Sequence, residues 1–162
     1  VIESQIKRTA ARVIELEAEE RAFNEELERL FELLPEVALI KSIPGVGCVY
    51  GATMIAEIAD ISRFRSPHHL ASYGGVAPAK EESGTSVKKV KKRKGGNRRL
   101  KNAFIQSAQR AAESDPVASE YYDRKRAEGK PHRVAVTAVA RKLCHIVFAV
   151  MRDQVPYDPG RE

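Results

Sequence analysis

The chain has 162 residues and a formal net charge of +6, so it can form a domain with its own core, and its charge favours polyanionic partners over acidic ones. No apolar run approaches the roughly 20 residues that cross a bilayer, so we expect no membrane partner. Cys48 and Cys144 stand far apart without the spacing of a zinc site, which indicates buried, reduced thiols and a cytoplasmic protein. The first residue is Val1 rather than methionine, as expected for a segment of a longer polypeptide.

Residues 1–35 carry apolar side chains that alternate three and four positions apart, if Thr9 and Glu20 are counted in the same row. The apolar members are Ile2, Ile6, Val13, Leu16, Phe23, Leu27, Leu30 and Leu34. Such a helix would extend roughly 50 Å, too far for the rest of the chain to cover, so the pattern predicts a coiled coil and a homo-oligomer. Thr9 and Glu20 weaken the row, which leaves open a single amphipathic helix lying on the domain. Pro35 marks the end of the row.

The pattern of residues 37–58 predicts a short helix, a glycine turn at Ile43–Gly47 and a second helix from Cys48 to Ile58. This order resembles a helix-hairpin-helix element, in which the turn and the following helix N-terminus hold a nucleic-acid backbone without reading bases. We therefore predict that Gly45 and Gly47 contact phosphate. The alternative is that these glycines only turn a tight corner between two packed helices.

The remaining regular elements also read as helices, so the fold class is mainly α, with a compact helical domain over residues 36–152 and a flexible tail over 153–162. Asp60 to Arg65 reads as a loop, and Ser66 and Pro67 supply the cap and first residue of a short helix. Further helices are predicted from Pro67 to Tyr73, from Asn97 to just before Asp115, from Pro116 to Glu128 and from Arg133 to Arg152.

Between residues 77 and 96 there is no helical period, and a flexible loop or hairpin is expected. A basic run begins in this segment and places nine cations within fourteen residues: Lys88, Lys89, Lys91, Lys92, Arg93, Lys94, Arg98, Arg99 and Lys101. No acidic residue lies among them, so the run predicts binding to the phosphates of nucleic acid rather than a merely solvated loop. Asn97 belongs to the predicted binding set because it caps a helix that directs Arg98 and Arg99 outward.

Ser83 and Gly84 directly precede the basic run. A serine beside dense positive charge could attack a phosphodiester, because the cations would stabilise the transition state, although composition alone also allows an ordinary loop serine. Ser86 is the nearest competitor. The histidines at positions 68, 69, 132 and 145 and the acidic residues at 57, 60, 81 and 82 lack the spacing of a metal site, so no metal is predicted in this chain.

The stretch from Ile43 to about Met151 resembles the C-terminal domain of the IS110-type insertion-sequence transposases. The resemblance is carried by Ile43–Gly47, Arg63-Phe64, Leu70–Pro78, Ser83-Gly84, Gly96-Asn97 with Leu100, Gly129-Lys130 and Arg141–Leu143. It implies a prokaryotic DNA recombinase guided by a bridge RNA, with a catalytic serine that falls on Ser83. The preceding helical row agrees with the coiled coil that joins the two halves of such enzymes.

The same resemblance implies an N-terminal RuvC-like half whose carboxylates hold a divalent metal such as Mg²⁺. That half is absent here, so we expect this chain to lack the metal and to be inactive alone. Lys101 departs from the family pattern, which more often has arginine, and this change keeps the charge but loses bidentate phosphate geometry. The competing hypothesis is a non-catalytic helix-hairpin-helix module of the architectural or ribosomal RNA-binding type.

Overall fold

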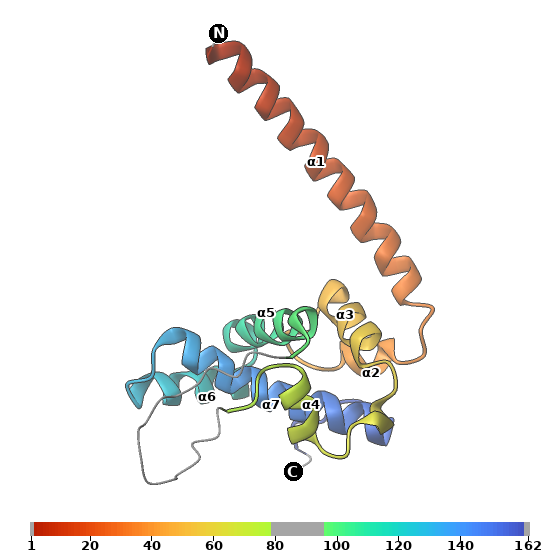
Figure 1. Ribbon diagram of the computed structural model, residues 1–162, viewed down its shortest axis with the longest axis vertical. Helices are drawn as coiled ribbons and strands as arrows, with labels where there is room; N and C mark the ends of the chain where they lie inside the picture. Colours follow the sequence, from red (N-terminus) through yellow and green to blue (C-terminus); the bar gives the residue numbers. More distant parts are fainter. Residues whose placement is uncertain (1, 79–95, 161–162) are drawn as a thin grey trace.

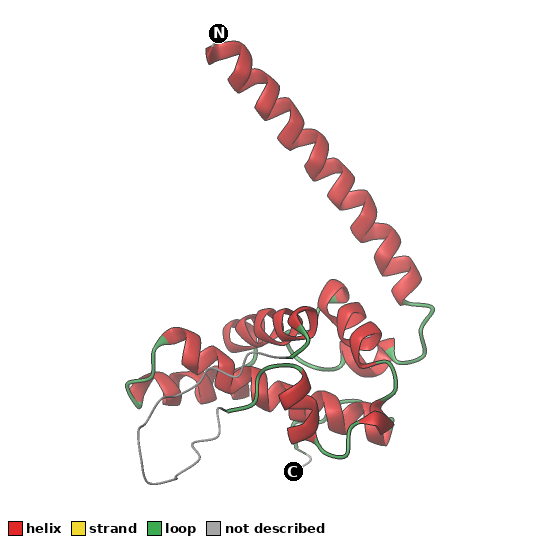
Figure 2. Ribbon diagram, viewed as in Figure 1, coloured by secondary structure: helices red, strands yellow, loops and turns green. Residues whose placement is uncertain are grey.

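The computed structural model describes residues 2–78 and 96–160, and in these residues every regular element is a helix (Figure 1, Figure 2). This confirms the mainly α prediction. The elements in chain order are α1 (Ile2–Phe31), α2 (Val37–Lys41), α3 (Cys48–Ile58), the 3-10 helix η1 (Ile61–Arg63), α4 (Pro67–Tyr73), α5 (Arg98–Ser114), α6 (Pro116–Ala127) and α7 (His132–Asp153).

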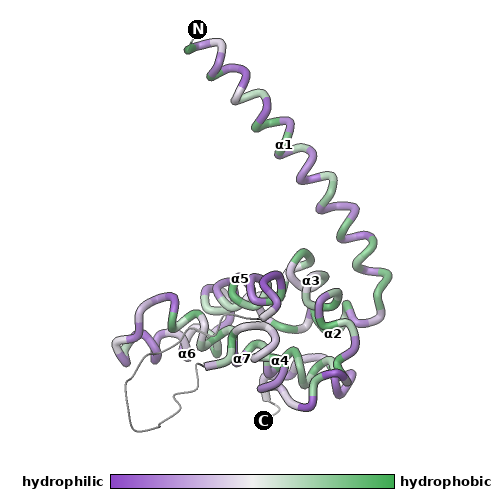
Figure 3. The backbone as a smooth tube through the Cα atoms, in the orientation of Figure 1, coloured by the Kyte–Doolittle hydropathy of each residue, from purple (hydrophilic) through white to green (hydrophobic). Residues whose placement is uncertain are grey.

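Helix α1 projects away from the bundle that the other helices form (Figure 1). Its large apolar side chains stay in solvent, with Ile2 75% and Phe23 74% exposed, and Figure 3 shows hydrophobic and hydrophilic residues alternating along it. Only Phe31 is buried, against Ile40 and the backbone of Gly51. Most of the apolar row is therefore uncovered among residues 2–78 and 96–160, which argues against a helix lying along the domain, although the end of α1 contacts α3.

Short-range capping sets where η1, α4, α5 and α6 begin. Ser66 Oγ accepts a hydrogen bond from the His69 amide at 3.2 Å, and Asp115 accepts one from the Ala118 amide at 2.8 Å. Each cap is followed by a proline in the first turn, where its missing N–H costs nothing. These starts agree with the sequence predictions, whereas α1 ends at Phe31, before the expected Leu34, in tight turns that approach Pro35.

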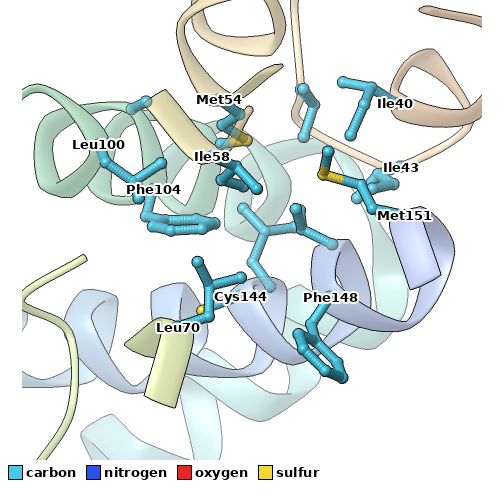
Figure 4. Packing of buried hydrophobic residues seen from close by; sticks show 14 of the residues in the cluster. Ile40, Ile43, Met54, Ile58, Leu70, Leu100, Phe104, Cys144, Phe148 and Met151 are labelled. Atoms are coloured by element: carbon cyan, nitrogen blue, oxygen red, sulfur yellow. The ribbon is translucent and has the colours of Figure 1, made fainter. Parts of the chain in front are cut away.

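Helix α7 lies at the centre of the core and packs against α5, α6 and α4. Ten of its residues are buried, including Cys144 and Met151, which lie among side chains from four other helices (Figure 4). The labelled neighbours are Ile40, Met54, Ile58, Leu70, Leu100 and Phe104. By length and composition α7 could cross a membrane, but 56% of its most apolar stretch is buried inside the bundle. Its apolar residues are thus used in packing.

The segment after α7 folds back onto α2. Gln154 adopts a left-handed conformation with φ of 55°, which turns the chain after Asp153. The Tyr157 amide then donates a hydrogen bond to Ser42 Oγ at 2.7 Å, and its half-buried ring packs against the core. We expected a flexible tail from residue 153, and the structure instead places this part of it in contact with the domain.

Candidate nucleic-acid interface

The glycine turn between α2 and α3 is packed against α5. Gly45 has φ of 77°, and a Cβ added there would lie 2.5 Å from the Ala111 nitrogen and would overlap the Ser107 carbonyl oxygen. Glycine is therefore required both by the backbone conformation and by the approach of α5. The side-chain face of Gly45 is closed to a phosphate, which favours the tight-corner alternative at this residue.

Gly47 lies in a different setting at the start of α3. It is the N-cap, and no side chain caps the helix, so the positive end of the helix dipole is open. An Nη1 atom of Arg110, from α5, lies 3.1 Å from the position of an added Cβ, and its guanidinium faces the Tyr50 ring at 5.9 Å. Residue spacing cannot predict the approach of Arg110, because sixty-odd positions separate it from the turn.

A cavity of about 400 Å³ lies beside this helix start, between α1 and the domain. Its lining combines Arg110 with Glu20 and Glu28 of α1. A phosphate bound there would gain from Arg110 and the helix dipole but would meet two carboxylates. The α3 start is thus a weaker anion site than the glycine pattern suggested.

Asn97 is a half-buried junction between three elements. Its side-chain oxygen accepts from the Leu100 amide at 2.9 Å, which confirms the predicted cap of α5. Its side-chain nitrogen donates to Glu57 of α3 and, at 3.2 Å, to the hydroxyl of Tyr73. The Asn97 amide also donates to the Tyr73 carbonyl at 2.7 Å. The side chain is therefore occupied by contacts within the protein.

Cations surround this junction on the solvent side. Arg98, Arg99 and Lys101 are exposed, as predicted, and Arg99 approaches the Glu57 carboxylate at 3.5 Å while 84% of its side chain stays in solvent. Arg63 faces the rings of Phe64 and Tyr73 at 5.6 and 5.9 Å. Sequence reasoning assigned no role to Arg63, although it belongs to the quoted family motif. We call Arg63, Arg98, Arg99 and Lys101 the α5 rim.

Ser83, Ser86 and the cations from Lys88 to Lys94 lie outside the described residues. The chain positions that flank them come together. A Cβ added at Gly96 would lie 3.1 Å from the Gly75 Cα, and the Val76 carbonyl accepts a hydrogen bond from Arg141 Nε at 3.1 Å. Gly75 and Gly96, on the two sides of these residues in the chain, are therefore neighbours next to Asn97 and the α5 rim.

Burial changes the protonation of two thiols and one histidine. Burial raises the pKa of the Cys144 thiol to about 12 and raises that of Cys48, so both stay protonated at neutral pH. Burial, with smaller effects from His68 and Arg141, lowers the pKa of His145, whose ring meets that of His68 at 4.9 Å. Across residues 2–78 and 96–160, no three His, Cys, Asp or Glu side chains gather as metal ligands would.

Comparison with known proteins gives a consistent family. The model of the transposase IS116/IS110/IS902 family matches residues 37–123, more than half of the chain. An insertion element IS110 protein of Streptomyces coelicolor is 38% identical over 138 residues, which are 85% of this chain and 34% of that protein. An insertion element IS900 protein of Mycobacterium paratuberculosis is 35% identical over 156 residues, 96% of this chain and 39% of that protein.

A pilin gene-inverting protein of Moraxella bovis is 33% identical over 129 residues, which cover 78% of this chain and 40% of that protein. The chain thus spans between a third and two fifths of the length of these three relatives, at 34%, 39% and 40%. The matched region begins at α2 and includes the glycine turn, the segment with Ser83 and the α5 rim. The chain belongs to the transposase IS116/IS110/IS902 family.

Proposed function

We propose that this chain is the C-terminal part of a DNA transposase or recombinase of an insertion sequence, working in the cytoplasm of a prokaryote. The observation that carries the proposal is the family match over residues 37–123. Relatives named for insertion elements and for gene inversion, similar over more than three quarters of this chain, support it. The proposal assigns the remaining two thirds of such a protein, including a RuvC-like half, to sequence beyond this chain.

In this proposal the α5 rim and the basic run bind the DNA backbone. The exposure of Arg98, Arg99 and Lys101 supports this role, since their side chains can reach phosphates from the solvent side. If about six cations of the run neutralise phosphates, the logarithm of the affinity should fall with the logarithm of salt concentration at a slope near −5. A bridge RNA would use the same phosphate chemistry, and Gly47 with Arg110 would add a contact of lower affinity.

Ser83 is proposed as the nucleophile. Its Oγ would form a bond to phosphorus as the bond from phosphorus to a deoxyribose oxygen breaks, and the leaving oxygen would take a proton. The reverse attack by a new strand would release the serine, so the phosphodiester energy is kept without an external source. The serine proton needs an acceptor, which we assign to the RuvC-like half. There a divalent metal such as Mg²⁺ would polarise the phosphate.

The exposed apolar row of α1 supports a coiled coil between copies of the protein. Pairing would bring the RuvC-like half of one copy near Ser83 of another. Sedimentation of this chain should then give a species heavier than a monomer, and substitution of Ile6 and Val13 by Asp should return it to the monomer mass. A monomer in the unsubstituted protein would remove this part of the proposal.

The proposed catalysis is tested in the full-length protein with its RNA and DNA. Ser83→Ala should abolish recombination and leave DNA binding unchanged, while the matched change Ser86→Ala should preserve both. Neutralising Lys88, Lys89, Lys91 and Lys92 should weaken binding as well. Recombination that survives Ser83→Ala would remove Ser83 from the mechanism and leave this chain a binding role.

A further inference from the structure

Helices α6 and α7 gather positive charge around one tyrosine. The Tyr121 ring of α6 faces Lys142 Nζ of α7 at 4.3 Å, the guanidinium of Arg124 at 5.0 Å and Lys125 Nζ at 5.6 Å. Cations attract the electron-rich face of an aromatic ring, so Tyr121 holds side chains of the same charge together that would otherwise repel. The ring thereby concentrates charge on the outer surface of these two helices.

The turn that follows α6 extends this surface. Arg126, Lys130 and Arg133 are exposed there, and Figure 1 shows α6 and the start of α7 at the end of the bundle away from α2. Arg126 donates to the Lys130 carbonyl at 3.0 Å, which fixes the turn without neutralising either charge. We call Arg124, Arg126, Lys130, Arg133 and Lys142 the α6–α7 basic surface.

Helix α6 also carries Glu120 and Asp123, and the turn after it carries Glu128. Glu128 accepts two hydrogen bonds from Lys125, at 2.7 and 2.9 Å, and this contact lowers its pKa, helped by Lys130 and Arg124. Among the carboxylates that the structure describes, none forms an ion pair with Arg124, Lys130 or Lys142. Glu128 is thus engaged by Lys125, and the cations of the surface are left for an outside partner.

The aromatic groups decide which polyanion fits. Proteins hold single strands by stacking unpaired bases on exposed aromatic rings. Here the Tyr121 ring is surrounded by cations, and the Tyr122 hydroxyl is bonded to His132 Nδ1 at 2.8 Å. The Tyr121 ring is thus already occupied by cations, and fixed cations on two helices suit the paired backbones of a duplex.

We propose that the α6–α7 basic surface binds the backbone of duplex DNA as a second contact, separate from the α5 rim and the basic run. This inference rests on the proposed function, from which it takes DNA as the duplex. Four of its five charges lie within residues 124–133, and Lys142 joins them only because α7 packs along α6 and places it on the Tyr121 ring.

The test compares two triple variants of this chain. One carries Arg124→Gln, Lys130→Gln and Arg133→Gln, which leave Lys142 on Tyr121 and the Lys125 ion pair in place. The control carries Lys7→Gln, Arg12→Gln and Arg29→Gln in α1, where each cation pairs with a glutamate of the same helix. Because both sets lower the formal net charge by the same amount, a difference between them reports location rather than total charge.

Binding is measured by fluorescence anisotropy with a labelled 30-base-pair duplex over a range of salt concentrations. The α6–α7 variant should lose on the order of 100-fold in affinity at 0.1 M salt, and its salt slope should fall by about 2.7, the value for three lost phosphate contacts. The control should change affinity less than about threefold, because its cations already have partners. Circular dichroism melting should stay within about 2 °C for both, as for other surface changes.

Equal losses in the two variants would overturn the inference, as would an α6–α7 variant that binds the duplex normally. Larger losses with a labelled single strand or an RNA duplex than with DNA would overturn the choice of partner. If the α6–α7 variant binds the duplex normally, and neutralising Lys88 to Lys92 weakens binding, the inference fails but the proposed function stands. Conversely, weaker DNA binding by the α6–α7 variant, together with intact recombination in Ser83→Ala, would remove the catalytic proposal alone. A wild-type chain that binds no duplex would contradict both the inference and the proposed function.

Discussion

Replacing Gly45 by alanine tests how the glycine turn is built. The added Cβ would lie 2.5 Å from the Ala111 nitrogen and 2.8 Å from the Ala111 Cβ, both parts of the rigid α5 helix. Gly129 is a matched control, because it has the same φ of 77° but no heavy atom of the described residues within 4 Å of an added Cβ. The two substitutions share the conformational cost and differ in the collision.

The magnitudes follow from these two contributions. A non-glycine residue in the left-handed region costs about 1–2 kcal/mol, and this cost applies to both variants. Forcing an extra methyl into a packed contact costs about 1–3 kcal/mol more. Gly45→Ala should therefore lose about 2–5 kcal/mol, a large share of the 5–15 kcal/mol that is typical of a domain, whereas Gly129→Ala should lose about 1–2 kcal/mol.

Urea denaturation followed by circular dichroism gives both free energies of unfolding. At about 2–4 °C per kcal/mol for a chain of this size, the melting temperature of Gly45→Ala should fall by roughly 4–20 °C. Equal losses in the two variants would refute the packing of this turn against α5. A Gly45→Ala variant that folds normally but binds DNA weakly would instead assign the glycine to phosphate binding.

Three further predictions concern buried groups. Asn97→Ala should lower the free energy of unfolding, measured in urea, by about 1–2 kcal/mol because the cap of α5 is lost. Asn97→Asp should keep the cap but place a second carboxylate beside Glu57. The Asn97→Asp variant should therefore gain stability in acid, where the pair of carboxylates is protonated. The Cys144 thiol should resist a disulfide reagent at pH 8 until the protein is unfolded. Because its folded pKa is about 12, stability should fall as pH rises above 9.0, the pKa of an unperturbed cysteine thiol, and Cys144→Ala should remove that fall. By NMR, the pKa of His145 should lie below 6.5 because burial disfavours the charged ring. The unfolded chain binds this proton more readily, so the free energy of unfolding should fall as the pH is lowered through 6.5. An unshifted titration would contradict the burial of the ring.

Features that depend on near neighbours in the chain could be predicted from the sequence. Ser66 with Pro67 and Asp115 with Pro116 begin helices because the cap side chain and the proline act within one turn. Asn97 caps α5 for the same reason. The apolar row of α1 could also be predicted, since its pattern lies within one helix.

Features that depend on packing between distant segments could not be predicted. Nothing near Gly45 in the chain indicates that α5 covers it, and nothing near Gly47 indicates that Arg110 lies beside it. The bond between Asn97 and Glu57 joins residues forty positions apart, so neither residue alone predicts it. Tyr157 reads as part of a polar tail because its partner, Ser42, lies 115 positions earlier.

The identification of a DNA adduct on Ser83 would test the central claim most directly. The full-length protein, with its RNA and a DNA substrate that traps the cleaved strand, is digested with trypsin and nuclease and analysed by mass spectrometry. Cleavage after Lys80 and Lys88 puts Ser83 and Ser86 on one peptide, so fragmentation must separate them. We predict a nucleotide-phosphate adduct on Ser83 that Ser83→Ala eliminates and Ser86→Ala retains. An adduct on Ser86 or elsewhere, or recombination without any adduct, would contradict the account.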